Sequence, residues 1–284
     1  MIPLDRLEKW SARLDECSRQ FLNEMEYQEY QSIPDPSKLR QLKAILEKPI
    51  ARFSSVNEAF FRAKWADVLS AVHPGKRLTL LEVASGDADM IPQTMARARP
   101  HSRYITANMN RILTERLREK TKDLPLEIVV IEEDAAKIEH YLPAESVDII
   151  AFQHGVNDVI QAILCDQEGV DTVYSDWMDT LPKMIKILQR EVSQNTLEQH
   201  AKPAFLSLLE RLSRVLKTGG VMVMSHYMFQ LDLDWGYPPR LWEDLLPIAR
   251  EWVKELPGCK EVFFEGFEPH WWIFFQKVQD AERE

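Results

Sequence analysis

Residues 78–90 read LTLLEVASGDADM, and this stretch decides the fold of the chain. Apolar, strand-favouring residues lead into small and acidic ones, and an amphipathic helical pattern begins at Met90. This order is typical of a buried parallel strand with a tight turn at its carboxyl end, where open α/β sheets bind ligands. The small residues Ala84 and Gly86 allow a ligand to approach backbone N–H groups at the start of the next helix. Glu82, at the strand tip, favours a ligand with hydroxyls or an ammonium over a phosphate.

The same pattern recurs along the chain. Further strand-like runs alternate with helical patterns at residues 104–107, 126–131, 147–152 and 221–224. This alternation indicates βαβ units and a parallel sheet. Residues 261–264 and 271–278 predict a closing antiparallel pair. The predicted fold class is α/β: a Rossmann-like, doubly wound, mostly parallel sheet with a C-terminal antiparallel hairpin and an N-terminal helical cap.

Two segments stand outside this rhythm. An apolar stripe over residues 4–30 predicts one helix, a shorter one precedes Pro49, and a third begins at the capping-box pattern of residues 55–58. We therefore expect a cap over 1–75 and a sheet domain over 76–284, with a helical insertion at about 160–200. The cap either closes over the ligand site or serves only for packing or contact within a homodimer. Its residues most able to touch a ligand are Arg62, Tyr27 and Tyr30.

Composition limits the partners. The chain has 35 Lys and Arg against 45 Asp and Glu, a formal charge of −10, and no basic run, so nucleic acid is not expected. Cys17, Cys165 and Cys259 lie far apart and predict reduced thiols rather than disulfides or a metal site. No apolar run approaches the roughly 18 residues that a membrane helix needs. These features predict a cytoplasmic protein without a membrane partner.

Residues 78–278 resemble the class I S-adenosylmethionine-dependent methyltransferases. In that family the first strand ends in an acid and a glycine-rich loop, which matches residues 80–88 here. An acid that holds the ribose usually follows the second strand, where this chain has Asn108, and an aspartate beside the adenine follows the third, where it has Asp134. The turn RVLKTGG at 214–220 is similar to the family's RVLKPGG, and its glycines are expected to cap the end of the preceding helix.

The match has two departures from the family pattern. Of the loop glycines only Gly86 remains, with Ala84 and Ala88 at the other small positions. Asn108 can donate one hydrogen bond to a ribose hydroxyl and accept another, but it cannot make the charge-assisted bonds of a carboxylate. A dinucleotide dehydrogenase would need three glycines in a G-x-G-x-x-G spacing, which the chain lacks.

The resemblance and the strand tips together predict three groups of site residues. The resemblance implies S-adenosylmethionine as cofactor, held by Glu82, Ala84, Gly86, Asn108, Asp134, Ala135 and Gln153. His154 and His226 are the candidate catalytic bases, and either could instead bond a backbone carbonyl or orient the substrate. The predicted substrate residues are Asn157, Asp158, Tyr174, Trp177, Tyr227 and Trp235, with Tyr237 as a further aromatic. Asn157 or Asp158 could equally cap a helix, and Trp271 and Trp272 are expected in the core.

The predicted function is methyl transfer from S-adenosylmethionine to oxygen or nitrogen of a small-molecule metabolite. Two alternatives stay open. A related enzyme could use the aminocarboxypropyl arm of the same cofactor, by transfer or cyclisation. Alternatively, the degenerate loop and Asn108 could mark a catalytically inactive binding module.

Overall fold

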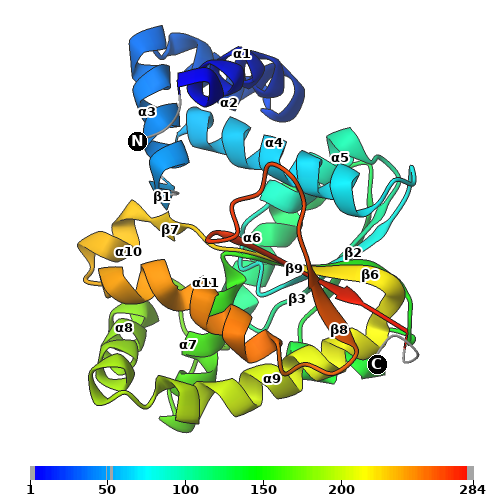
Figure 1. Ribbon diagram of the computed structural model, residues 1–284, viewed down its shortest axis with the longest axis vertical. Coiled ribbons are helices and arrows are strands. Elements are labelled where there is room, and N and C mark those ends of the chain that lie inside the picture. The colour runs from blue at the N-terminus through cyan, green and yellow to red at the C-terminus, as the bar shows by residue number, and fades with distance from the viewer. Residues whose placement is uncertain (1–3, 49, 52–53, 280–284) are drawn as a thin grey trace.

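A seven-stranded sheet forms the centre of the computed structural model, which describes residues 4–48, 50–51 and 54–279 (Figure 1). The strand order is β4-β3-β2-β5-β6-β9-β8. The strands are β2 (Thr79–Val83), β3 (Arg103–Ala107), β4 (Glu127–Ile131), β5 (Val147–Gln153), β6 (Leu216–Ser225), β8 (Cys259–Val262) and β9 (Trp272–Lys277). Strands β2 to β6 pair in parallel, and β9 runs antiparallel to both β6 and β8. The predicted Rossmann-like fold class is confirmed.

The order of the strands reverses at β2. The chain moves outward from β2 to β3 and β4, then returns to place β5 and β6 on the other side of β2. The carboxyl ends of β2 and β5 therefore flank a topological switch point. In open α/β sheets, ligands bind in the crevice at this point.

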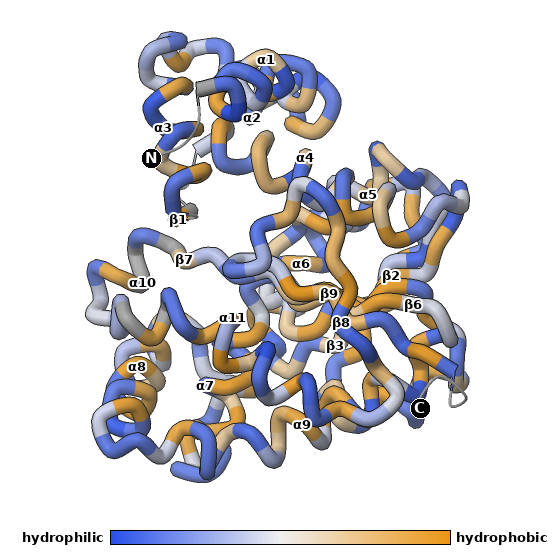
Figure 2. Tube along the Cα trace, in the orientation of Figure 1, coloured by the Kyte–Doolittle hydropathy of each residue, from blue (hydrophilic) through white to orange (hydrophobic). Residues whose placement is uncertain are grey.

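Helices cover both faces of the sheet because side chains alternate along each strand. Leu81, Ile105 and Ile150 face a core that includes residues of α7 (Gly155–Gln167), α8 (Trp177–Gln194), α9 (Leu197–Val215) and α11 (Pro239–Val253). Leu80 and Tyr104 face a second core shared with α4 (Ser55–Val72) and α5 (Met90–Ala98). Figure 2 shows the strands mostly in the hydrophobic colours, whereas the helices alternate along their length. The remaining connections in the parallel half are α6 (Arg111–Thr121) and a 3-10 helix, η1 (Ala135–His140).

The helices of the N-terminal region begin and end at other residues than predicted. The single helix predicted over 4–30 is two helices, α1 (Leu4–Phe21) and α2 (Glu24–Ser32), because Asn23 and Glu26 form a capping box that starts α2. After α3 (Asp35–Glu47), Ser54 rather than Ser55 caps α4. Short strand β1 (Ile50–Ala51) pairs with β7 (Met228–Phe229), so the expectation of helices alone is wrong. This pairing joins the N-terminal region to the segment that follows β6.

The last helix of the N-terminal region is part of the sheet's packing. Trp65, Val68 and Leu69 of α4 are buried in the same core as Leu80 and Tyr104 of the sheet. The region 1–75 therefore has its inner helix against one sheet face, and the other N-terminal helices pack outside it (Figure 1). The division into two domains near residue 75 stays a prediction.

The turn at 214–220 also differs from expectation. Its glycines do not end α9, which stops at Val215, but lie within the long strand β6. A Cβ on Gly220 would come within 2.9 Å of the Asp148 carbonyl oxygen. Glycine is needed there for the close approach of β6 to β5 rather than for a helix cap. The short helix α10 (Gln230–Asp234) was not predicted. Within the described ranges, no helix has both the length and the apolarity needed to cross a membrane.

Candidate functional site

Two tight turns meet across the switch point, and both contain strained backbone. Ala84 (φ 56°) follows β2 and His154 (φ 54°) follows β5, both in the left-handed region that non-glycine residues rarely adopt. Such a conformation costs on the order of 1 kcal/mol and concentrates at ligand sites. A Cβ on Gly155 would lie 2.9 Å from the Val83 carbonyl oxygen, so only glycine lets the two turns approach this closely. Gly86 (φ 58°) is also left-handed.

Glu82 is the buried acid of this site. It is 1% exposed, and Oε2 accepts a hydrogen bond of 2.7 Å from the Tyr104 hydroxyl. Burial raises the pKa of Glu82 from 4.5 to about 8, although the Tyr104 hydrogen bond opposes the rise. The carboxyl group is therefore mostly neutral at pH 7. A buried acid with a shifted pKa at a strand tip is a candidate for binding a ligand.

Asn108 holds the loop after β2 in place. Its Nδ2 donates a 2.8 Å hydrogen bond to the carbonyl of Gly86, and its side chain is buried. The loop is fixed further by the Ala84 N–H, which donates to the carbonyl of Ala107, and by the hydroxyls of Ser85 and Thr106, 2.8 Å apart. An amide can make the bond to Gly86, whereas an ionised carboxylate has no donor for it. This contact accounts for the departure at the predicted ribose position.

Asp134 and Ala135 are the predicted cofactor residues after β4, and Gln153, the last one, lies at the end of β5. Asp134 is exposed and caps η1 by accepting a 2.8 Å hydrogen bond from the N–H of Ala136, while Ala135 is buried. The parallel register of β2, β3 and β4 brings Glu82, Asn108 and Asp134 to the same edge of the sheet. We call this edge, from Glu82 to Ala135, the cofactor half.

The tips of β5 and β6 form the other half of the edge. Gln153 Nε2 donates 2.9 Å to the Tyr227 hydroxyl, and Gln153 Oε1 is buried without a hydrogen-bond partner among the described residues. His154 lies parallel to His226, with ring centroids 5.6 Å apart, and to Tyr227, at 5.1 Å. The structure thus brings the two predicted catalytic histidines together with Tyr227. We call Gln153, His154, Ser225, His226 and Tyr227 the acceptor half.

The environment of His154 changes what it can do. Burial lowers the pKa of its ring from 6.5 to about 4, so the imidazole is neutral at pH 7 but a weak base. Asn157 lies on the same side, with Nδ2 3.4 Å from His154 Nε2, and also donates 2.9 Å to Asp158 Oδ1. These contacts suit His154 to orienting a neighbour more than to removing a proton.

The predicted aromatic residues separate into two groups. Tyr227 is buried in the acceptor half and stacks on Phe61 of α4, with centroids 4.5 Å apart. Tyr174 and Trp235 are 71% and 40% exposed, and neither joins the histidine cluster. Trp177 packs partly buried at the start of α8, and Tyr237 is buried in the core below the sheet.

The three N-terminal candidates are structural in this conformation. Arg62 is 2% exposed and ion-pairs with Glu26 and Glu58, and it also donates to the carbonyl of Phe21. Tyr30 is buried and donates to Asp15 Oδ1. Tyr27 packs against the same core.

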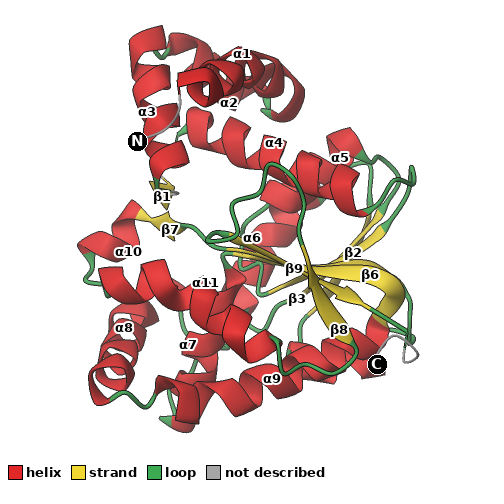
Figure 3. Ribbon diagram, in the orientation of Figure 1, coloured by secondary structure: helices red, strands yellow, loops and turns green. Residues whose placement is uncertain are grey.

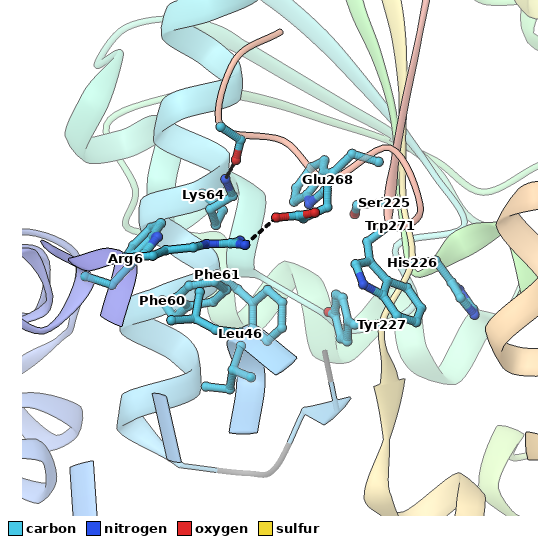
Figure 4. A pocket seen from close by; sticks show the side chains of 14 residues that line it. Arg6, Leu46, Phe60, Phe61, Lys64, Ser225, His226, Tyr227, Glu268 and Trp271 are labelled. Atoms are coloured by element: carbon cyan, nitrogen blue, oxygen red, sulfur yellow. Dashed lines mark hydrogen bonds and ion pairs between the residues drawn. The ribbon is translucent and has the colours of Figure 1, made fainter. Parts of the chain in front are cut away.

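Sequence reasoning missed a cavity beside the acceptor half, drawn in Figure 4. Its walls come from α1, α3, α4, the tip of β6 and the loop between β8 and β9. Its volume is about 40 Å³, room for a few water molecules. Trp271 and Trp272 both line it; Trp272 is also buried in the core, as expected, whereas Trp271 is only partly buried. The only local signal was the spacing of Lys64 from Phe60 (i, i+4) and from Phe61 (i, i+3) along one helix.

No model of a known family matches the chain, and no curated protein matches it. Solved structures with similar folds include a methyltransferase dependent on S-adenosylmethionine from Aquifex aeolicus (14% identity, 76% of this chain and 98% of that chain covered, TM-score 0.45). Another is a protein assigned by its name to the rRNA methylases, from Clostridium thermocellum (11% identity, 76% of this chain and 96% of that chain covered, TM-score 0.44). A third is the CurJ carbon methyltransferase (12% identity, 98% of this chain and 72% of that chain covered, TM-score 0.45). These identities and scores are too low to carry an activity or a substrate.

The strand order of the sheet decides the fold type independently of these scores. The order in which the chain adds its five parallel strands reverses at β2, and an antiparallel pair closes the sheet beside β6. The fold is that of the class I methyltransferases. Within the described residues there is no cluster of three or more side chains suited to a metal ion.

Proposed function

We propose that the protein binds S-adenosylmethionine in the cofactor half and transfers its methyl group to oxygen or nitrogen of a small-molecule metabolite held by the acceptor half. The observation that carries the proposal is the pair of strained turns at the switch point, with the buried Glu82 carboxyl beside one and His154 in the other. Strain of this kind persists where the surrounding structure maintains it for function.

The residues of the cofactor half fit this cofactor. Glu82 would pair with the ammonium of the amino-acid end, and Gly86, which has no side chain, would let that end approach the loop backbone. Asn108 would meet a ribose hydroxyl, and Asp134 with Ala135 the adenine. Gln153, at the border with the acceptor half, adds a buried acceptor, because its Oε1 has no hydrogen-bond partner in the described part of the chain. A carboxyl group and an amide oxygen suit an amino-acid nucleoside better than a polyphosphate.

The cofactor supplies an electrophilic methyl group on a sulfonium, and the displacement is in line. The protein's part is then mainly to align the acceptor. The Gln153–Tyr227 hydrogen bond fixes the tips of β5 and β6 relative to each other. His154, neutral because its pKa is about 4, accepts or donates a hydrogen bond and orients the acceptor. Any proton that the acceptor must lose goes to His226 in this proposal.

A small metabolite is favoured over nucleic acid by the net charge of −10 and by the enclosed cavity beside the acceptor half. We extend the proposal to a cytoplasmic enzyme, with dimerisation through the N-terminal helices as a further possibility to test by its mass in solution.

Calorimetric titration with S-adenosylmethionine tests the cofactor assignment. Glu82→Gln keeps the shape of the side chain but cannot ionise beside the ammonium, and we expect it to weaken binding at least tenfold, about 1.4 kcal/mol. The matched control is Glu127→Gln on the exposed start of β4, which should bind as the wild type does. Unchanged affinity in Glu82→Gln would show that the site is misplaced.

The products separate the competing reactions. S-adenosylhomocysteine indicates methyl transfer, and methylthioadenosine indicates use of the aminocarboxypropyl arm. No binding at millimolar cofactor would reject both enzymatic proposals. Binding without turnover of any acceptor would favour the inactive binding module.

A further inference from the structure

The cavity beside the acceptor half contains a buried lysine without a carboxylate partner. Lys64 on α4 is 7% exposed, and its Nζ donates a 2.6 Å hydrogen bond to the carbonyl of Gly266 (Figure 4). Gly266 belongs to the connection between β8 and β9, which Figure 3 shows as a loop. The ammonium otherwise faces aromatic rings, 4.1 Å from the centroid of Phe267 and 5.7 Å from that of Trp10. Among the described residues, no carboxylate lies within ion-pair distance of Lys64.

The nearby carboxylates are paired with arginines instead. Glu268, in the β8–β9 loop, pairs with Arg6 of α1 at 2.5 Å. Asp67, one turn after Lys64 on α4, accepts two hydrogen bonds from Arg13 of α1. The charged groups around Lys64 are thus Arg6 and Arg13, both positive, and Asp67 and Glu268, both negative. With Lys64 included, three positive charges face two negative ones, in a protein whose net charge is −10.

Keeping a buried cation without an anion is costly, because the ammonium loses its hydration. Burial accordingly lowers the pKa of Lys64 to about 8. Packing does not explain the residue, since an apolar side chain of this size would fill the same space at no electrostatic cost. A perturbed cation that lines a cavity is a candidate binding group.

The far side of the cavity adjoins the acceptor half. Ser225 and His226 line it, and Ser225 Oγ is buried without a hydrogen-bond partner in the described part of the chain. Phe60, Phe61 and Trp271 form an aromatic part of the lining, and the ion pair of Arg6 and Glu268 lines the cavity beside Lys64 (Figure 4). The cavity therefore has a cation, Lys64, at one side, aromatic rings along its wall, and the polar side chains of Ser225 and His226 at the other side.

We propose that this cavity is the acceptor pocket and that it takes an aromatic carboxylate, whose anion binds Lys64 and whose nucleophilic group faces Ser225 and His226. This inference rests on the proposed function for the role of the bound molecule as methyl acceptor, but the binding itself does not require it. A molecule of this size needs more than 40 Å³, so the β8–β9 loop, held by Lys64 and Arg6, moves outward as the anion replaces the Gly266 carbonyl. The aromatic body then packs on the rings that now surround the ammonium.

Pairs of probes that are matched in shape but differ in charge test this pocket without the cofactor. Benzoate, phenylacetate and 1-naphthoate are titrated calorimetrically into the full-length protein, each beside its uncharged amide. We expect at least one acid to bind at least tenfold more tightly than its amide. Lys64→Met should reduce that ratio to below about twofold, while the control Lys76→Met, an exposed lysine in the loop before β2, should leave it unchanged.

Thermal unfolding shows whether Lys64→Met is folded, and we expect its midpoint to equal or exceed that of the wild type because a buried cation is removed. If it does not fold, Arg6→Gln, at the partly exposed rim, replaces it and should lower the ratio severalfold. Equal affinity for acids and amides, no binding of any acid at millimolar concentration, or a ratio that survives Lys64→Met overturns the inference. Anion-selective binding in a protein that does not bind S-adenosylmethionine would leave the pocket standing and reject the proposed function alone.

Discussion

The cofactor half and the acceptor half lie on one sheet edge, yet the same physical cause acts on them in opposite directions. Glu82 and His154 are both buried at strand tips beside the switch point. Burial disfavours the charged form of either group, so it raises the pKa of the acid to about 8 and lowers that of the imidazole to about 4. Between these values both side chains are mostly uncharged. The two groups should therefore destabilise the protein as pH changes in opposite directions.

The largest expected effect is the loss of stability as pH rises from 4.5 to about 8, through Glu82. Its folded-state pKa is raised, so its contribution to stability is full below pH 4.5 and is lost as pH rises through about 8. The difference is worth up to about 5 kcal/mol of unfolding free energy. Glu82→Gln cannot ionise, and its stability should fall less than that of the wild type between pH 5 and 9 in urea unfolding. Parallel curves for the two proteins would mean that the carboxyl group is already hydrated or paired.

A smaller effect, of opposite sign, is expected at acid pH through His154. Its pKa is lowered in the folded state, so its contribution is present above pH 6.5 and is lost as pH falls through about 4. The loss amounts to about 3 kcal/mol. Asn tolerates the left-handed backbone of this position, so His154→Asn should keep the turn while losing this acid sensitivity. Exposed His140, replaced by Asn, serves as the control. An unchanged slope between pH 7 and 4 in His154→Asn would contradict a buried, neutral imidazole.

The two halves also differ in how far the sequence predicts them. The cofactor half consists of residues at or just after the ends of their strands, so strand patterns and turn residues were enough to place Glu82, Asn108 and Asp134 at one sheet edge. The cavity depends on contacts between distant segments, such as Lys64 with Gly266, 202 positions apart, and Phe61 with Tyr227. No local pattern reports such pairs. The exposure of an individual side chain could not be predicted from the sequence either. Tyr174 was therefore expected at the site, although its side chain is exposed to solvent.

Asn108 shows where a motif comparison needs the contact as well as the residue type. The family pattern suggests that Asn108→Asp should leave cofactor binding intact or tighten it, through a charge-assisted bond to the ribose. The structure adds an opposing term, since aspartate would lose the donor to the Gly86 carbonyl and place two acceptors 2.8 Å apart. We expect Asn108→Asp to lower the stability of the ligand-free protein by about 1 kcal/mol. Its affinity for S-adenosylmethionine should stay within about threefold of the wild type, less than 1 kcal/mol.

Asn108→Ala separates the two terms, because it loses the bond to the Gly86 carbonyl without gaining a charge. It should be as unstable as Asn108→Asp but should bind the cofactor about tenfold more weakly than the wild type. Thermal unfolding and calorimetry of the two variants give both quantities. If the aspartate variant binds as weakly as the alanine variant, the ribose does not lie at Asn108, and the residue serves only to hold the loop. If both bind as the wild type does, the cofactor does not contact the tip of β3, and the hydrogen bond of Asn108 serves only the fold of the loop.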